Sequence, residues 1–163
     1  MMMFKKIALI FGLSLSSISM NSSADDALPI QTIQSLYSHS MEMSKHIEHF
    51  SNNELLVKFA TPSLKKVFNA DSAYVSKSKE LGCLDHDVMW QTNDSAEGAN
   101  LYLQQVDYKF IVVGIGATEG LEARSITYEM SCNANECKID DLWYEDQSFK
   151  EGMTACLKEL KAL

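Results

Sequence analysis

Asp141 is the residue of this chain best suited by its surroundings to acid–base chemistry. Placing Cys132 opposite Cys137 sets a register in which three further pairs share one face: Met130–Ile139, Tyr128–Asp141 and Ile126–Trp143. A carboxylic acid on an apolar face is unstable unless it is paired or protonated, and a raised pKa suits a general acid or base. Asp141 is therefore the candidate catalytic or ligand-binding acid. The structural alternative is that it bonds the Tyr128 hydroxyl or lies near the sheet edge.

Aromatic and aliphatic side chains are predicted to gather around this acid in a concave sheet. The candidate pocket-lining residues are Tyr108, Phe110, Ile126, Tyr128, Met130, Ile139 and Trp143. An acid that moves a proton inside an aromatic cavity would suit an isomerase or hydratase, or a carrier of a small apolar molecule. The same side chains would serve equally well as core packing.

A second group of polar residues lies in the middle of the chain. Its members are Asp85, Asp87, Gln91 and Asp94, with His86 and Asn93 between them. Such oxygen-rich clusters bind calcium or supply an acid–base group, but this spacing lacks the glycine and terminal glutamate of the twelve-residue calcium loop. A solvated capping turn explains the cluster as well. No metal site is predicted, because the calcium-loop pattern, the C-x₂-C pairs of zinc ribbons and the His-Glu-x-x-His pattern are all lacking. No cofactor is predicted, and phosphate-loop and nucleophile motifs are absent from the sequence.

The first 24 residues have the pattern of a signal peptide. Lys5 and Lys6 precede an apolar run from Ile7 to Ile18, and Ser22-Ser23-Ala24 offers a small-residue cleavage site. We expect cleavage near Ala24, no lipid anchor, and a periplasmic or secreted protein formed by residues 25–163 as one domain.

The composition is acidic and almost free of arginine. The full chain carries 14 basic and 22 acidic residues, a formal net charge of −8. Arg124 is the one arginine of the sequence. This charge argues against nucleic acid or an anionic membrane as partner, and a clamp of several arginines around a phosphate is impossible.

Export places the four cysteines in an oxidising compartment, where two disulfides are expected. Three connectivities are possible. The hairpin register favours Cys132–Cys137, which leaves Cys83–Cys156 to tie the middle of the chain to its C-terminal helix.

The apolar periodicity predicts helices at the start and end of the domain. The expected helices are Pro29–Phe50, Glu54–Ala60, one capped by Thr61 and ended by Gly82, and Gln147–Leu163. The expected strands are a short one at Val88–Gln91, a long one from Leu101 through Asp107 to Ile115, and a hairpin of Leu121–Cys132 with Cys137–Tyr144. This order predicts an α+β fold with helices on one face of a curved antiparallel sheet.

Helices followed by a strand meander that ends in Lys138-Ile-Asp-Asp-Leu142 resemble the nuclear-transport-factor-2-like superfamily. Cys137 stands where that superfamily often has an aromatic residue. The Asp85-x-Asp87 stretch with Gln91 and Asp94 resembles exported bacterial domains of unknown function in the same superfamily, although this chain has extra residues between Gln91 and Asp94. The resemblance implies a cone-shaped, cystatin-like α+β fold and a concave pocket, not an activity.

Two functional hypotheses remain open. The first is a non-enzymatic exported domain that holds another protein, for example an immunity-type protector that occludes a toxin. The second is a small-molecule carrier or an isomerase-like or hydratase-like enzyme that uses Asp141. The sheet edge would also allow a homodimer beside the monomer.

Overall fold

The computed structural model describes residues 24–46, 50–93 and 98–163. Its elements are α1 (Ala24–Ser44), α2 (Asn52–Phe59), α3 (Pro62–Ser78), β1 (Leu101–Gln105), β2 (Phe110–Ile115), β3 (Arg124–Cys132), β4 (Cys137–Tyr144), β5 (Gln147–Ser148) and α4 (Phe149–Glu159). The prediction of an α+β protein is confirmed. The predicted signal peptide falls on residues 1–23, outside the described residues, so its cleavage near Ala24 stays a prediction.

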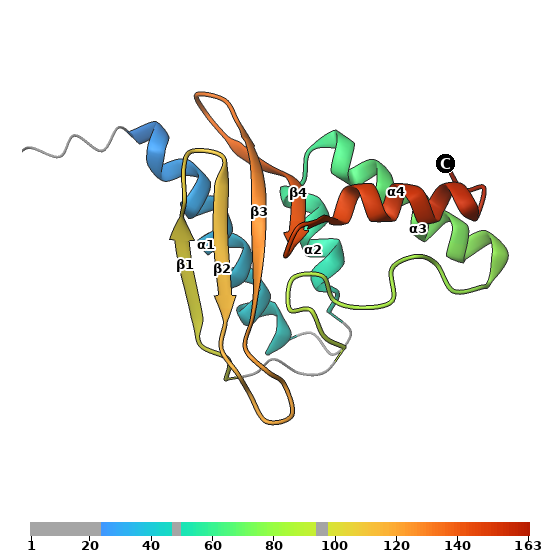
Figure 1. The fold of residues 1–163 in the computed structure, drawn as a ribbon, viewed down its shortest axis with the longest axis horizontal. Helices are drawn as coiled ribbons and strands as arrows, with labels where there is room; N and C mark the ends of the chain where they lie inside the picture. Colours follow the sequence, from blue (N-terminus) through green and yellow to red (C-terminus); the bar gives the residue numbers. More distant parts are fainter. Residues whose placement is uncertain (1–23, 47–49, 94–97) are drawn as a thin grey trace, which may run out of the picture.

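The strands form one antiparallel sheet in the order β1-β2-β3-β4-β5. Helix α1 runs along one face of this sheet, while α2, α3 and α4 lie towards and beyond β4 (Figure 1). We call the face under α1 the inner face and the opposite one the outer face. Strands β2 and β3 turn their fully or nearly fully buried side chains to the inner face: Ile111, Val113, Ile115, Ile126, Tyr128 and Met130.

Side chains cap the starts of three helices. Ser51 accepts from the backbone N–H of Glu54, Thr61 from that of Leu64, and Ser148 from that of Glu151. None of the helices in the described ranges has the length and apolar character needed to cross a membrane.

Helices α1 and α3 end earlier than predicted. Helix α1 stops at Ser44 rather than Phe50, and α3 stops at Ser78 because Lys79 adopts a left-handed conformation with φ of 61°. A residue in this conformation ends a helix even when it is not glycine, so Gly82 is not the stop signal.

The predicted continuous strand from Leu101 to Ile115 is wrong, because the chain reverses between β1 and β2. The Asp107 carboxylate accepts hydrogen bonds from the backbone N–H groups of Lys109 at 2.7 Å and Phe110 at 2.9 Å. A short acidic side chain that bonds its own downstream backbone in this way forms a turn.

The predicted strand at Val88–Gln91 is also wrong, because these residues form a turn closed by a bridge between Asp87 and Thr92. The Asp87 carboxylate accepts from the backbone N–H groups of Met89 and Trp90. This side chain therefore replaces the hydrogen bonds that a neighbouring strand would have made.

The β3–β4 hairpin begins in the predicted register and then leaves it. Cys132 pairs with Cys137 and Met130 with Ile139, but Glu129 pairs with Asp141. Asp140 is thus an extra residue in β4, a β-bulge that moves every later side chain by one position.

Two further contacts hold the bulge in place. The Asp140 carboxylate accepts from the Thr61 hydroxyl at 2.8 Å and from Lys150 Nζ at 2.7 Å. The predicted pairs Tyr128–Asp141 and Ile126–Trp143 are therefore wrong, since Tyr128 pairs with Leu142 and Trp143 with Thr127.

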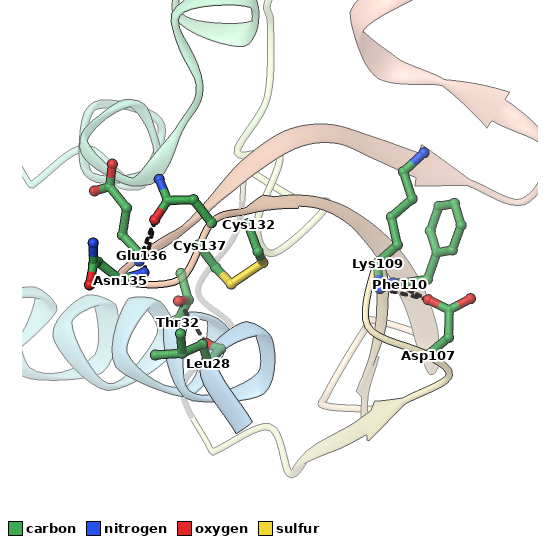
Figure 2. Close-up of a disulfide and its surroundings, with 10 residues drawn as sticks. Leu28, Thr32, Asp107, Lys109, Phe110, Cys132, Asn135, Glu136 and Cys137 are labelled. Carbon is green, nitrogen blue, oxygen red and sulfur yellow. Dashed lines mark hydrogen bonds between the residues drawn. A yellow bond between two sulfur atoms is a disulfide. The ribbon is translucent and has the colours of Figure 1, made fainter. Parts of the chain in front are cut away.

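Both predicted disulfides are present. Cys132–Cys137 closes the β3–β4 turn, and Figure 2 shows it with Leu28 and Thr32 of α1 on one side and the turn at Asp107 on the other. Cys83–Cys156 joins the segment after α3 to α4 across 73 residues of sequence. It lies beside the buried carboxylate of Asp71, which accepts from the Cys83 backbone N–H at 2.6 Å.

Candidate functional site

Asp141 is 3 % exposed, and its carboxylate is directed at the start of α4. Oδ1 accepts from the backbone N–H groups of Leu142 at 2.8 Å and Lys150 at 2.9 Å, and Oδ2 accepts from the Ser148 hydroxyl. Both oxygens are therefore bonded to protein donors, and the carboxylate acts as a cap at a helix N-terminus. This environment supports a structural role rather than proton transfer.

Tyr128 bonds another tyrosine instead of Asp141. Its hydroxyl lies 2.9 Å from that of Tyr37, which donates to the Met89 carbonyl at 2.8 Å. Burial raises the pKa of both phenols, so each hydroxyl stays protonated at neutral pH. The pair links α1, β3 and the turn after α3 across the inner face.

The predicted pocket-lining residues divide between two faces. Four of them are buried on the inner face and fill the core: Ile126, Tyr128, Met130 and Ile139. Phe110 and Trp143 lie half-buried on the outer face, because side chains alternate along a strand and their neighbours Ile111 and Leu142 point to the inner face. Tyr108 is 71 % exposed in the β1–β2 turn. The seven residues therefore do not surround one cavity.

The loop that carries Asp85 and Asp87 packs beneath the sheet. Its carbonyls accept hydrogen bonds from side chains of four elements: His86 from Asn53 of α2, Val88 from Tyr144 of β4, Met89 from Tyr37 of α1, and Trp90 from Arg124 of β3. Val88 and Met89 are fully buried. We call this segment the plug loop, because these contacts hold it against the inner face of the sheet.

Asp87 anchors the plug to the start of α2. Its carboxylate accepts from the side chain of Asn52 at 2.6 Å as well as from the two backbone N–H groups of the turn. Burial raises the pKa of Asp87, and these hydrogen bonds oppose that rise. The arrangement is that of a structural acid.

The other predicted polar residues lie apart from Asp87. The exposed Asp85 carboxylate accepts from His86 Nδ1 at 2.8 Å, a hydrogen bond that lowers the pKa of Asp85. Gln91 has a φ of 51° and donates to the Ser125 carbonyl. Asp94 lies outside the described residues. Within the described ranges, no three His, Cys, Asp or Glu side chains gather as a metal site would require.

A cleft of about 870 Å³ opens between α2, α3 and the plug loop. Phe68 and Leu84 contribute apolar surface, and Asn69, Asp85 and His86 contribute polar groups. The charged side chains at its rim have both signs, so the cleft does not by itself indicate one class of ligand.

The outer face presents a row of side chains that sequence reasoning missed. In register across four strands lie Gln104, Val112, Thr127 and Trp143. The neighbouring rows add two more exposed residues, Tyr102 at 66 % and Val106 at 61 %. The alternation in Leu101–Gln105 and the turn-forming Asp107 were the sequence signals that could have revealed this face.

The charges on this face neutralise one another. Glu129 accepts from Lys109 Nζ at 2.7 Å and from the Trp143 indole N–H at 3.0 Å. The Lys109 ammonium also lies 5.4 Å from the centre of the Phe110 ring. Exposed aromatic side chains with few free charges are typical of protein-binding surfaces.

Comparison with protein-family models, with curated proteins and with solved structures gives no match for this chain. The resemblance to the nuclear-transport-factor-2-like superfamily therefore stays a prediction.

Proposed function

We propose that this protein is an exported, non-enzymatic domain that binds another protein through the outer face of its sheet. The observation that carries the proposal is the pair of exposed residues Tyr102 and Val106 on a face that no described helix covers (Figure 1), with the exposed Tyr108 in the adjoining β1–β2 turn. Aromatic anchors of this kind contribute a large share of binding energy in protein interfaces. The immunity-type protector of the first hypothesis is one form of such a domain.

Two features support a location outside the cytoplasm. Both cysteine pairs form disulfides, and disulfides persist in oxidising compartments. The signal-peptide pattern of the first 24 residues agrees with periplasmic or secreted localisation. We extend the proposal to the cone-shaped fold that the Lys138–Leu142 resemblance implies.

Net charge defines the partner further. A chain with a formal charge of −8 attracts basic proteins at long range, whereas contact on the outer face depends on apolar and aromatic area. We therefore expect a partner with a basic surface around an apolar centre.

The alternative, a carrier or an isomerase-like enzyme, depends on an available Asp141 carboxylate. Its oxygens are bonded to Ser148 and to backbone N–H groups, and the neighbouring inner-face positions are packed. We therefore favour the binding domain.

Affinity capture from the native envelope tests the proposal. The bait proteins are the wild type, the double variant Tyr102→Ser/Tyr108→Ser, and the control Leu81→Ser, which changes an 89 % exposed apolar residue away from the sheet. We expect a basic protein to be enriched by the wild type and the control and reduced at least ~10-fold with the double variant, the change that about 1.4 kcal/mol produces. Equal enrichment by all three baits, or none, contradicts the proposal.

A further inference from the structure

Strand β1 forms the long free edge of the sheet. It has five residues, whereas the opposite edge ends in β5 with two, and Figure 1 shows β1 at the left border of the sheet. An edge strand offers a row of backbone donors and acceptors to another strand.

The direction of these groups follows from two hydrogen bonds. Gly116 donates to the Asn100 carbonyl and Val106 donates to the Phe110 carbonyl, so the even-numbered residues of this segment bond β2. The backbone groups of Leu101, Leu103 and Gln105 therefore point away from β2. Within the described residues, no backbone bond from outside the sheet reaches them.

The edge has none of the features that usually prevent strand pairing. The nine residues from Gly98 to Val106 contain no charged residue and no proline, in a chain with 36 charged residues. The register of β1 with β2 is continuous, with no bulge. Proteins normally protect an edge with lysine, proline or a bulge, so an unprotected edge of this length indicates pairing with another strand.

We propose that β1 pairs with β1 of a second copy of this chain, antiparallel and across a twofold axis at Leu103. Leu101 then faces Gln105 of the partner subunit, and Leu103 faces Leu103 of the partner subunit. Each of these pairs exchanges two backbone hydrogen bonds. On the outer face, Tyr102 lies beside Gln104 of the partner subunit.

The strand suits a second copy because its register is self-complementary. Each of the three residues whose backbone groups point away from β2 has a hydrogen-bonding partner in the second copy, and no like charges oppose one another. The two Asp107 side chains stand about eight residues apart along the paired strands, roughly 27 Å, which is beyond the screening length in physiological salt. Elsewhere two acidic copies repel each other, so the uncharged edge is where they can approach.

This geometry joins two sheets into one of ten strands and leaves both outer faces open. The proposal goes beyond partner binding and does not depend on it. It predicts that dimerisation strengthens as salt screens the repulsion between the acidic subunits.

The first test uses the purified protein alone, by sedimentation velocity and amide hydrogen exchange over a range of concentrations. At about 0.5 M NaCl we expect a tighter dimer than at about 0.05 M. The amides of Leu101, Leu103 and Gln105 should gain protection as the dimer forms, while those of Tyr102 and Gln104 are protected throughout. A monomer at every concentration overturns the proposal, as does protection of the three amides in a monomer, which would indicate that the chain covers its own edge.

The second test probes the register with charges at exposed positions. Tyr102→Lys/Gln104→Lys places like charges beside each other across the axis and should weaken the dimer at least ~10-fold, the change that about 1.4 kcal/mol produces. Tyr102→Lys/Gln104→Glu places opposite charges there and should restore the dimer. Equal dissociation constants for the two variants, with folding verified by circular dichroism, overturn the proposed register.

Discussion

The backbone N–H of Lys150 donates a 2.9 Å hydrogen bond to Asp141, a residue on the neighbouring strand β4. The Asp141 carboxylate thus accepts a hydrogen bond from a backbone N–H in the first turn of α4, which begins directly after the short strand β5. A buried carboxylate in this position interacts favourably with the positive end of the helix dipole and holds the start of α4 against the core.

Asp141→Asn should lower the free energy of unfolding by about 1–3 kcal/mol, because it removes a charge from the helix terminus and one acceptor from the Ser148 hydroxyl. Urea unfolding at neutral pH measures the change. Asp146→Asn, at an exposed position three residues before α4, is the matched control and should change stability by less than about 0.5 kcal/mol. Equal stability of the two variants would remove the capping role and return Asp141 to the functional candidates.

The hairpin and its disulfide could be predicted from the sequence because they depend on local alternation and a four-residue polar loop. Cys132 and Cys137 flank that loop, and the first two pairs of the register follow from them. The later pairs could not be predicted, because the bulge at Asp140 depends on Thr61 and Lys150, which are 79 and 10 residues away in sequence. One extra residue then moved Asp141 away from Tyr128.

The outer face was missed for a related reason. The β-branched run after Asp107 indicated a strand, and strand propensity does not show where a side chain bonds its own backbone and reverses the chain. With β1 and β2 read as one strand, Tyr102 and Val112 would lie ten residues apart along it, and nothing in the sequence indicated that a reversal sets them on adjacent strands of one sheet. The loop at Asp87 likewise depends on Asn52, which is 35 residues away.

The two disulfides should contribute unequally to stability. On the chain-entropy model, removing Cys83–Cys156 with two alanines costs about 4 kcal/mol, and removing Cys132–Cys137 costs about 2 kcal/mol, because the first closes a much longer loop. Thermal unfolding of the two double-alanine variants without reductant gives the order. A larger loss from the hairpin pair would show that packing at that turn outweighs loop entropy.

The ion pair between Asp140 and Lys150 should make stability depend on acid pH. Burial acts to raise the pKa of Asp140, but the hydrogen bonds from Lys150 and Thr61 outweigh it and hold that pKa below the ordinary value of an aspartate. A lowered pKa in the folded state adds stability that is present above the unfolded value and lost as pH falls through the folded value.

Lys150→Met isolates this contribution, since the backbone N–H of residue 150 can still bond Asp141. The difference in free energy of unfolding between wild type and variant should be constant from neutral pH to about 5 and shrink below about 4. Acid titration of urea unfolding measures it, with Lys158→Met on the same helix as control. A difference that does not change with pH would contradict an ionic contribution from Asp140.

A final prediction concerns the hydrogen-bond chain that fixes the plug loop. The Trp90 indole donates to the Ser40 hydroxyl at 3.0 Å, and that hydroxyl donates to Oδ1 of the Asn52 side chain. Nδ2 of the same side chain donates to the Asp87 carboxylate at 2.6 Å. Asp87→Asn turns two amide donors towards each other, and Asn52→Asp turns two carboxylates towards each other. Each change should destabilise the protein by about 1–3 kcal/mol.

Exchanging the two residues restores the chain. In Asn52→Asp/Asp87→Asn, the amide introduced at position 87 donates to the carboxylate at position 52, whose other oxygen still accepts from Ser40. We expect the exchanged protein within about 1 kcal/mol of wild type, and a coupling energy of about 2 kcal/mol in the double-mutant cycle. Urea unfolding of the four proteins provides the cycle. Additive losses would show that Asn52 and Asp87 do not act as a pair, and that the loop is held without help from Asn52.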